Sequence, residues 1–208
     1  MAGCLPPSPT RSSEGIFVAL RLAERARFLR AFLAHPRQMG AILPTSRWAV
    51  NDMLDMADVP GADVVVELGA GTGVATGEIL ARLKPGARLI ALEIAPELAR
   101  LLEEWFDDPR LEVVCDSAEH IEKYLSGAKA DVVVCALPFT SLDAGLRRRL
   151  LDGLPAMLAP TGTAVVIQYS PLIQGELRKR FASVQRRISP RNVPPAFLFA
   201  CSQDAGAA

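Results

Sequence analysis

The stretch Val64-Val65-Val66-Glu67-Leu68-Gly69-Ala70-Gly71-Thr72-Gly73 decides the fold class of this 208-residue chain. Its first half is short and mostly apolar, as in a parallel strand that is buried on both faces. Glycine then recurs at alternate positions, where it permits a positive φ angle and lets a ligand approach the backbone closely. A helix-like segment follows from Thr76. This order predicts a nucleotide crevice at the carboxyl end of the first strand of an open α/β sheet.

The spacing of the glycines argues against a dinucleotide. The dinucleotide fingerprint is GxGxxG, whereas position 74 is Val, which leaves only GxGxG. An acidic residue downstream favours a nucleoside instead. Glu93 ends the apolar run 89–92, twenty residues after Gly73. A carboxylate at this place can accept hydrogen bonds from both ribose hydroxyls.

A third polar position completes the pattern. Asp116-Ser117-Ala118 follows the apolar run 111–115, where a carboxylate and backbone amides can contact an adenine edge. Each feature also has a simpler explanation: a tight turn at the glycines, a solvated strand end at Glu93, and a helix N-cap at Asp116. In this order and spacing, the three together favour a nucleoside cofactor.

Apolar runs alternate with helix-like segments along the rest of the chain. The predicted strands are 64–68, 89–92, 111–115, 132–137, 164–169, 183–188 and 196–201, and the predicted helices are 76–83, 96–106, 118–125 and 142–158. This alternation predicts an α/β fold with a mostly parallel sheet and right-handed crossovers. Two more helices are expected earlier, at about 14–34 and from the N-cap Ser46 to about Ala57.

The pattern divides the chain into four parts. Residues 1–13 are expected to be disordered, 14–44 to form an amphipathic helix and a substrate-side loop, 45–201 to form one α/β domain, and 202–208 to be a tail. The first residues contain no apolar signal segment. The uncharged stretch 153–175 contains three prolines, so it does not suit a spanning helix. We therefore expect a cytoplasmic protein.

Charge is unevenly distributed, although 23 basic and 23 acidic side chains cancel. Residues 1–50 carry a net charge of +5, residues 51–144 carry −11, and residues 145–208 carry +6. This distribution excludes a uniformly basic protein that coats nucleic acid, but it permits one basic face. The four cysteines form no CxxC pair and the two histidines lie far apart, so we expect reduced thiols and no metal site.

The glycine loop with Glu67, Glu93 and Asp116 resembles the nucleoside-binding motifs of class I S-adenosylmethionine-dependent methyltransferases. The resemblance covers about residues 45–201. It implies a Rossmann-like sheet of seven strands with helices on both faces and an antiparallel last strand. It also implies S-adenosyl-L-methionine as cofactor and S-adenosyl-L-homocysteine as product. The implied cofactor-binding residues are Glu67, Gly69, Ala70, Gly71 and Thr72 with Gly73 for the methionine moiety, Glu93 and Ile94 for the ribose, and Asp116, Ser117 and Ala118 for the adenine.

The segment after the fourth predicted strand bears on the methyl acceptor. Adenine and glutamine N-methyltransferases begin this tetrad with Asn or Asp, whereas this chain has Ala136-Leu137-Pro138-Phe139 and lacks the amide that holds a target amine. Aromatic residues are also few, 12 of 208, for a protein that flips or stacks bases. Both features argue against nucleic acid as a partner.

A second resemblance runs from about residue 16 to residue 201. The segments 28–32, 35–46, 136–139, 167–170 and 192–197 are similar to the bacterial soluble-type phosphatidylethanolamine N-methyltransferases. This implies a phospholipid substrate that is methylated towards phosphatidylcholine, and no obligate protein partner is evident. The expected substrate-binding residues are Thr45, Ser46, Leu137, Pro138, Tyr169, Arg187, Arg191 and Asn192. Arg187 or Arg191 would bind the lipid phosphate, because a guanidinium suits phosphate oxygens.

The segment 14–34 carries the predicted membrane contact. Its leucines recur at helical spacing to form an apolar stripe, and arginines surround that stripe. A basic amphipathic helix is typical of a membrane surface, where each arginine contributes about 1 kcal/mol near anionic lipid. An ordinary packing helix is the alternative. The expected membrane-contacting residues are Arg21, Arg25, Phe28, Leu29, Arg30 and Phe32, on the inner face of the cell membrane.

Tyr169 is the predicted catalytic residue. An alkylammonium has no lone pair and titrates near 10.4, so the amine must lose a proton. Desolvation and a nearby sulfonium both favour the neutral amine, and orientation rather than a strong base is expected to dominate. A core tyrosine is the alternative for Tyr169. Two other functions remain open: a ribosomal RNA adenine N6-methyltransferase-like enzyme, and a non-catalytic S-adenosylmethionine-binding scaffold.

Overall fold

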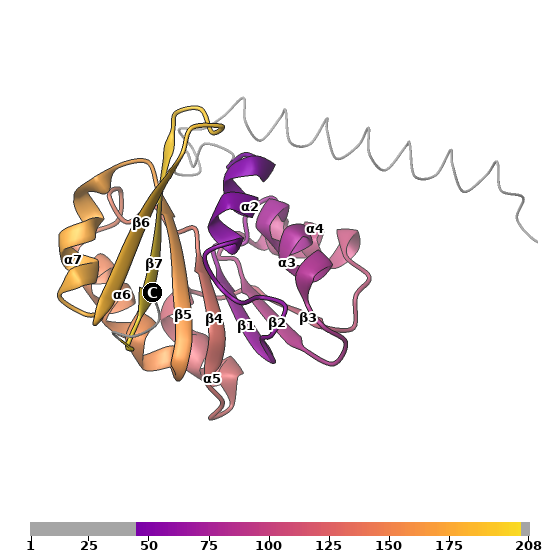
Figure 1. The fold of residues 1–208 in the computed structure, drawn as a ribbon. Helices are drawn as coiled ribbons and strands as arrows, with labels where there is room; N and C mark the ends of the chain where they lie inside the picture. Colours follow the sequence, from indigo (N-terminus) through magenta and orange to yellow (C-terminus); the bar gives the residue numbers. More distant parts are fainter. Residues whose placement is uncertain (1–44, 205–208) are drawn as a thin grey trace, which may run out of the picture. The chain divides into compact units, whose positions relative to one another are not determined.

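The computed structural model describes residues 45–204 of the chain. They form one seven-stranded sheet in the order β3-β2-β1-β4-β5-β7-β6 (Figure 1). The strands are β1 (Val64–Leu68), β2 (Arg88–Leu92), β3 (Leu111–Val114), β4 (Ala130–Cys135), β5 (Leu158–Gln168), β6 (Ser183–Ser189) and β7 (Ala196–Ser202). The predicted helix at 14–34 and its membrane-contacting residues lie outside the described residues.

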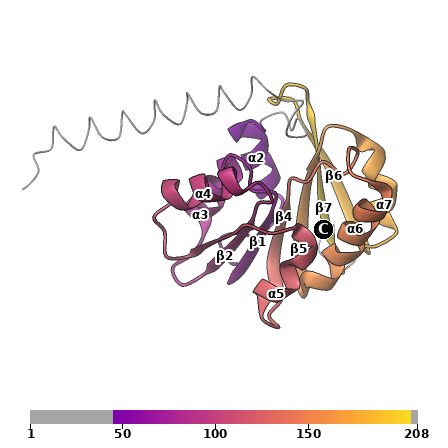
Figure 2. The same ribbon diagram turned by 180° about the vertical axis from the view of Figure 1, so that it is seen from behind.

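Helices cover both faces of the sheet (Figures 1 and 2). The helices are α2 (Arg47–Leu54), α3 (Val74–Arg82), α4 (Pro96–Trp105), α5 (Ile121–Leu125), α6 (Ala144–Met157) and α7 (Gln174–Arg178), with 3-10 turns η1 (Ala118–His120) and η2 (Pro171–Ile173). Helices α2 to α4 lie on one face, and α5 to α7 lie on the other. Consecutive strand residues such as Val65 and Val66 are buried in opposite core layers. This explains why the strands are apolar at nearly every position.

The strand directions bring the segments of interest to one edge of the sheet. Strands β1 to β5 are parallel, and β7 runs antiparallel to both β5 and β6. Gln168 at the end of β5 pairs with Phe197 near the start of β7, and Ser189 at the end of β6 pairs with Ala196. The carboxyl ends of the parallel strands and the β6–β7 loop therefore share this edge, where open α/β sheets bind ligands.

Helix α2 begins where the sequence predicts. The Ser46 hydroxyl accepts a hydrogen bond from the Ala49 amide at 3.2 Å, so Ser46 is the N-cap. The buried face of α2, which includes Val50 and Met53, packs in the core layer shared with α3, β5 and β7. Ser189 donates a hydrogen bond to Asp52 at 2.5 Å and ties α2 to the end of β6.

Strand β5 begins earlier than predicted, at Leu158 rather than at residue 164. Its first residue pairs with Ala130, and the register then shifts so that Thr163 pairs with Val132. A Cβ atom at Gly162 would lie 2.8 Å from the Ala130 carbonyl oxygen, so this irregularity needs glycine. The uncharged stretch 153–175 thus passes from α6 directly into a bulged strand. The sequence pattern had predicted a turn before residue 164, because the bulge interrupts the apolar run.

The structure also differs from the predicted bounds of one helix and one strand. The predicted helix 118–125 consists of η1 followed by the short helix α5. Strand β3 ends at Val114, so Cys115 is exposed rather than buried in a strand. Cys135 and Cys201 are buried, and burial raises the pKa of both thiols to about 12.

Candidate active site

The loop between β1 and α3 depends on its three glycines. Gly69, Gly71 and Gly73 have φ angles of 81°, 54° and 75°, in the region that side chains rarely adopt. A Cβ atom at Gly69 would lie 3.0 Å from Leu137, and one at Gly73 would lie 2.7 Å from Leu102. At Gly71 no heavy atom of the described residues, apart from Gly71 and its two neighbours in the chain, lies within 4 Å of that position. The loop is therefore packed at both ends and open at its middle, where a ligand can approach the backbone.

Glu67 is buried beneath this loop with half of its carboxylate unpaired. The side chain is 1% exposed. Its Oε2 accepts a hydrogen bond from the Thr76 hydroxyl at 2.7 Å, while its buried Oε1 has no hydrogen-bond partner in the described part of the chain. Burial raises the pKa of Glu67 to about 7, against the lowering effect of Thr76. A buried, half-satisfied carboxylate is costly unless a cation or donor pairs with it.

Glu93 joins the end of β2 to the glycine loop. Its Oε2 accepts a hydrogen bond from the Gly71 amide at 2.8 Å, and its Oε1 accepts one from the Ala95 amide at 2.9 Å. The side chain is 8% exposed. Each carboxylate oxygen has a second lone pair, so two further hydroxyl donors can bind. Ile94, beside it, is 71% exposed and presents an apolar surface at the same edge.

Asp116 is held in place by three donors at the end of β3. Its Oδ1 accepts from the Ser117 amide at 2.7 Å and lies 2.8 Å from the His120 ring, and its Oδ2 accepts from the Tyr124 hydroxyl at 2.8 Å. His120 and then Tyr124 hold the pKa of this carboxyl well below its usual range. The residue that caps η1 is Ser117, not Asp116. The carboxylate is therefore oriented by its neighbours and is not used as a helix cap.

These three positions fit a nucleoside with a cationic tail. They lie at the ends of adjacent parallel strands, β1, β2 and β3. The unpaired Oε1 of Glu67 can accept from an ammonium group, and Glu93 can accept from ribose hydroxyls. The open backbone at Gly71 leaves room between them. The residues present thus suit S-adenosylmethionine, and Thr76 is a supporting residue that the sequence pattern did not single out.

The predicted substrate residues converge from three distant segments. The Thr45 and Tyr169 hydroxyl oxygens are 3.2 Å apart. The Ser46 amide donates to Asn192 Oδ1 at 2.7 Å, and the Asn192 amide group donates to the Pro194 carbonyl at 2.8 Å. Asn192 is only 1% exposed. Asn192 therefore fastens the β6–β7 loop to the start of α2, next to Tyr169.

Leu137 lies between this group and the glycine loop. Its carbonyl accepts a hydrogen bond from the side-chain amide of Gln168 at 2.7 Å. Gln168 is 3% exposed and was not predicted, although a polar residue at the end of an apolar strand is a signal for such a role. Pro138 follows Leu137 and is half-buried. Phe139 is fully buried in the core, so it is not available to stack on a base.

The structure separates the two arginines expected to bind phosphate. The Arg191 guanidinium lies 5.2 Å from the centre of the Trp48 ring, close to Ser46 and Asn192. Arg187 is exposed on the edge strand β6, and no polar contact joins it to another predicted residue among those described. Trp48, which is 60% exposed, was not predicted.

Two further findings concern residues 45–204 only. No three His, Cys, Asp or Glu side chains in this range are grouped so that they could hold a metal ion. No helix in this range is long and apolar enough to cross a membrane.

Comparisons with known proteins identify the family of the chain. Residues 65–162 match a family described as a methyltransferase domain. The chain is 36% identical over 179 residues to an ornithine lipid N-methyltransferase from Singulisphaera acidiphila. The matched region covers 84% of this chain and 93% of that protein.

Solved structures share the fold at low sequence identity. The N-methyltransferase NodS from Bradyrhizobium japonicum WM9, in complex with S-adenosyl-L-homocysteine, has a TM-score of 0.61 at 18% identity, covering 85% of this chain and 97% of that chain. An O-methyltransferase family protein from Burkholderia thailandensis has a TM-score of 0.63 at 17% identity, covering 86% of this chain but only 60% of that one.

The predicted fold is confirmed: seven strands, Rossmann-like and mostly parallel, with an antiparallel strand inserted beside β5. The family relationship rests on the 36% identical relative and on the matched methyltransferase domain. The predicted cofactor is confirmed with it. The chain belongs to the class I S-adenosylmethionine-dependent methyltransferases.

Proposed function

We propose that the protein methylates the amine of a membrane-lipid head group. The observation that carries this proposal is the 36% identity to an ornithine lipid N-methyltransferase over 93% of that protein's length. Ornithine lipid and phosphatidylethanolamine both present a primary amine close to an anionic group. Phosphatidylethanolamine as the substrate, and phosphatidylcholine as its end product, stay predictions.

When bound, S-adenosylmethionine supplies an electrophilic methyl group on its sulfonium. The residues of this chain would bind and orient the reactants. We propose that Glu67 and the glycine-loop amides hold the methionine moiety, Glu93 with Ile94 the ribose, and Asp116 with Ser117 and Ala118 the adenine. These are the ends of three adjacent strands, so the sheet itself fixes their spacing.

In this proposal Tyr169 and Leu137 orient the amine. Gln168 fixes the Leu137 carbonyl, whose second lone pair can accept an N–H from a substrate. The Tyr169 hydroxyl, near Thr45, can accept or donate a further hydrogen bond. Orientation of this kind can contribute about 7–11 kcal/mol to a transfer reaction. A neutral amine is favoured in such a partly buried place, because burial disfavours its charged form.

The same edge of the sheet carries exposed apolar and basic side chains that suit a membrane surface. Val193 is 88% exposed in the β6–β7 loop, which rises above the sheet in Figure 1, and Trp48 is 60% exposed beside Arg191. Tryptophan is enriched at membrane interfaces, where arginine also pairs with anionic lipid. We propose that this edge faces the inner leaflet; membrane contact by the segment 14–34 stays a separate prediction.

Methyl transfer tests the main proposal. The full chain is incubated with labelled S-adenosylmethionine and vesicles of ornithine lipid or phosphatidylethanolamine, with and without anionic lipid, and separately with ribosomal RNA. Label in lipid, rising with anionic lipid, is expected, and Gly71→Val should abolish it. Label in RNA but not in lipid would favour the RNA enzyme, and binding of S-adenosylhomocysteine without label in either would favour a scaffold.

Vesicle flotation tests the membrane contact. Trp48→Ser combined with Val193→Ser is expected to reduce binding to anionic vesicles while binding of S-adenosylhomocysteine is unchanged. Full vesicle binding by this variant would contradict the assignment of these two residues to the membrane.

A further inference from the structure

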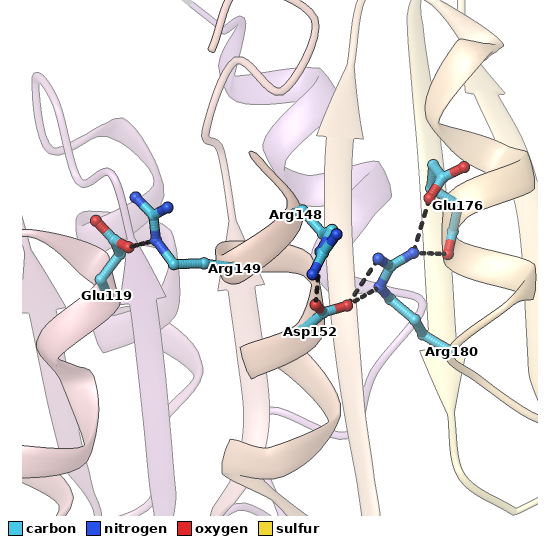
Figure 3. A network of polar contacts seen from close by, with 6 residues as sticks. All are labelled: Glu119, Arg148, Arg149, Asp152, Glu176 and Arg180. Atoms are coloured by element: carbon cyan, nitrogen blue, oxygen red, sulfur yellow. Dashed lines mark hydrogen bonds and ion pairs between the residues drawn. The ribbon is translucent and has the colours of Figure 1, made fainter. Parts of the chain in front are cut away.

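Helix α6 carries three consecutive arginines in its first half, and their surroundings differ. Figure 3 shows that Arg149 pairs with Glu119 and that Arg148 pairs with Asp152. The distances are 2.5 Å and 3.8 Å. Arg147 is half-buried, yet no ion pair or hydrogen bond joins its guanidinium to any described residue. Within residues 45–204, no carboxylate therefore neutralises the charge of Arg147.

Arg147 lines a cavity of about 450 Å³. This volume lies in the range of small-molecule sites, roughly 300–1,000 Å³. The cavity is lined by Phe139, Thr140, Ala144, Arg147, Arg148, Leu151, Leu172, Ile173 and Glu176. Its other charged groups are already paired: Arg148 with Asp152, and Glu176 with Lys179 and Arg180. Of the two arginines that line the cavity, Arg147 is the one that has no ion pair with any described residue.

The cavity is lined in part by the loops that follow β4 and β5, the same two loops that carry the residues proposed to orient the amine. Thr140 is three residues after Leu137 in the loop that follows β4, and Leu172 is three residues after Tyr169 in the loop that follows β5. Leu137 and Tyr169 are the two residues proposed to orient the amine. Leu172 is 78% exposed, so the cavity has an apolar side chain next to solvent or lipid. A molecule with its amine between these two loops can extend into the cavity.

We propose that this cavity binds the anionic group of the lipid head group, with Arg147 as its counter-ion. This inference rests on the proposed function. Ornithine lipid carries a carboxylate and phosphatidylethanolamine a phosphodiester, each a few bonds from the amine. A guanidinium binds both kinds of anion through paired hydrogen bonds. Arg147 then takes the role that the sequence assigned to Arg187 or Arg191, and the acyl chains leave past Leu172.

A matched pair of variants tests this assignment. Arg147→Gln and Arg149→Gln remove the same charge from adjacent helix positions, but Arg149 does not line the cavity. Hydrogen bonds to charged groups contribute about 1.5–3 kcal/mol, or roughly a tenfold to hundredfold change in affinity. Arg147→Gln is therefore expected to raise the KM for anionic amine lipids at least about tenfold, and Arg149→Gln to leave it nearly unchanged. Binding of S-adenosylhomocysteine should be the same in both.

An N-acylated 1,4-diaminobutane, which keeps the acyl chain, the spacing and the primary amine of ornithine lipid but has no anionic group, provides the second comparison. Wild type and Arg147→Gln should methylate it with similar KM. If the KM of Arg147→Gln for anionic lipids equals that of Arg149→Gln, or if Arg147→Gln raises the KM for the acylated diamine by the same factor, the inference is wrong while the proposed function stands. If the wild type labels no lipid, both are wrong. A larger effect on ornithine lipid than on phosphatidylethanolamine would identify a carboxylate as the preferred anion, and the reverse a phosphate.

Discussion

Glu67 provides the most direct test of the cofactor site, because its protonation depends on what occupies the site. Burial raises its pKa from the ordinary value of 4.5 to about 7. Each unit of pKa corresponds to 1.36 kcal/mol, so holding the ionised carboxylate in this place costs about 3 kcal/mol. Replacing Glu67 with Gln keeps the shape and removes the charge.

The pH dependence of stability has a definite sign. Below pH 4.5 the folded and unfolded states both hold the proton. Between 4.5 and about 7 only the folded state retains it, so the free energy of unfolding falls as the pH rises through this window. Relative to Glu67→Gln, the ligand-free wild type should lose up to about 3 kcal/mol between acid and neutral pH. Urea titrations at several pH values measure this difference.

Ligand binding should have the opposite pH dependence. The α-ammonium of S-adenosylhomocysteine prefers the ionised carboxylate, so below pH 7 Glu67 must release a proton when the ligand binds. The affinity should then rise about tenfold from pH 5.5 to pH 7, below the range of about 7.7–8.0 in which an α-amino group titrates. Calorimetry measures both the affinity and the released proton.

The control for charge is Glu103→Gln, which removes an exposed carboxylate from α4. It should bind the ligand with the same pH dependence as the wild type, whereas Glu67→Gln should bind weakly and without that dependence. Equal affinity of the wild type at pH 5.5 and pH 7, or an unchanged dependence in Glu67→Gln, would refute the assignment of Glu67 to the ammonium group.

Three other predictions concern the supports of the site. Gly73→Ala should destabilise the protein more than Gly86→Ala in thermal denaturation: both have a positive φ, which costs about 1–2 kcal/mol, but only at Gly73 does the new Cβ meet other atoms. Equal losses would contradict the steric argument. Asn192→Ala leaves the Ser46 amide without its acceptor and should cost about 1–3 kcal/mol in urea unfolding; no loss would mean that the loop is not fastened there. Glu93→Ala should weaken S-adenosylhomocysteine binding at least about tenfold by calorimetry, and unchanged binding would remove Glu93 from the site.

The sequence by itself was sufficient for the parts of the site that depend on local pattern. A strand buried on both faces is apolar at nearly every position, and a turn with positive φ selects glycine, so β1 and its loop were readable from residues 64–73. An acidic residue directly after an apolar run marks the carboxyl end of a parallel strand. Glu93 and Asp116 were found in this way.

The start of β5 could not be predicted from the sequence, because it depends on a contact with another strand. Leu158 pairs with Ala130, and the bulge that follows is possible only because Gly162 lies against a carbonyl of β4. The sequence pattern within residues 153–175 does not predict that contact.

The choice among arginines was decided by tertiary structure alone. Arg147, Arg148 and Arg149 are equivalent in the sequence, which instead favoured Arg187 or Arg191 for binding an anion. The fold places Glu119 and Asp152 beside two of the three, whereas Arg147 lines the cavity and has no ion-pair partner among residues 45–204. Hydrophobic periodicity records burial within a few residues, whereas the state of a charge depends on groups that approach it from distant parts of the chain.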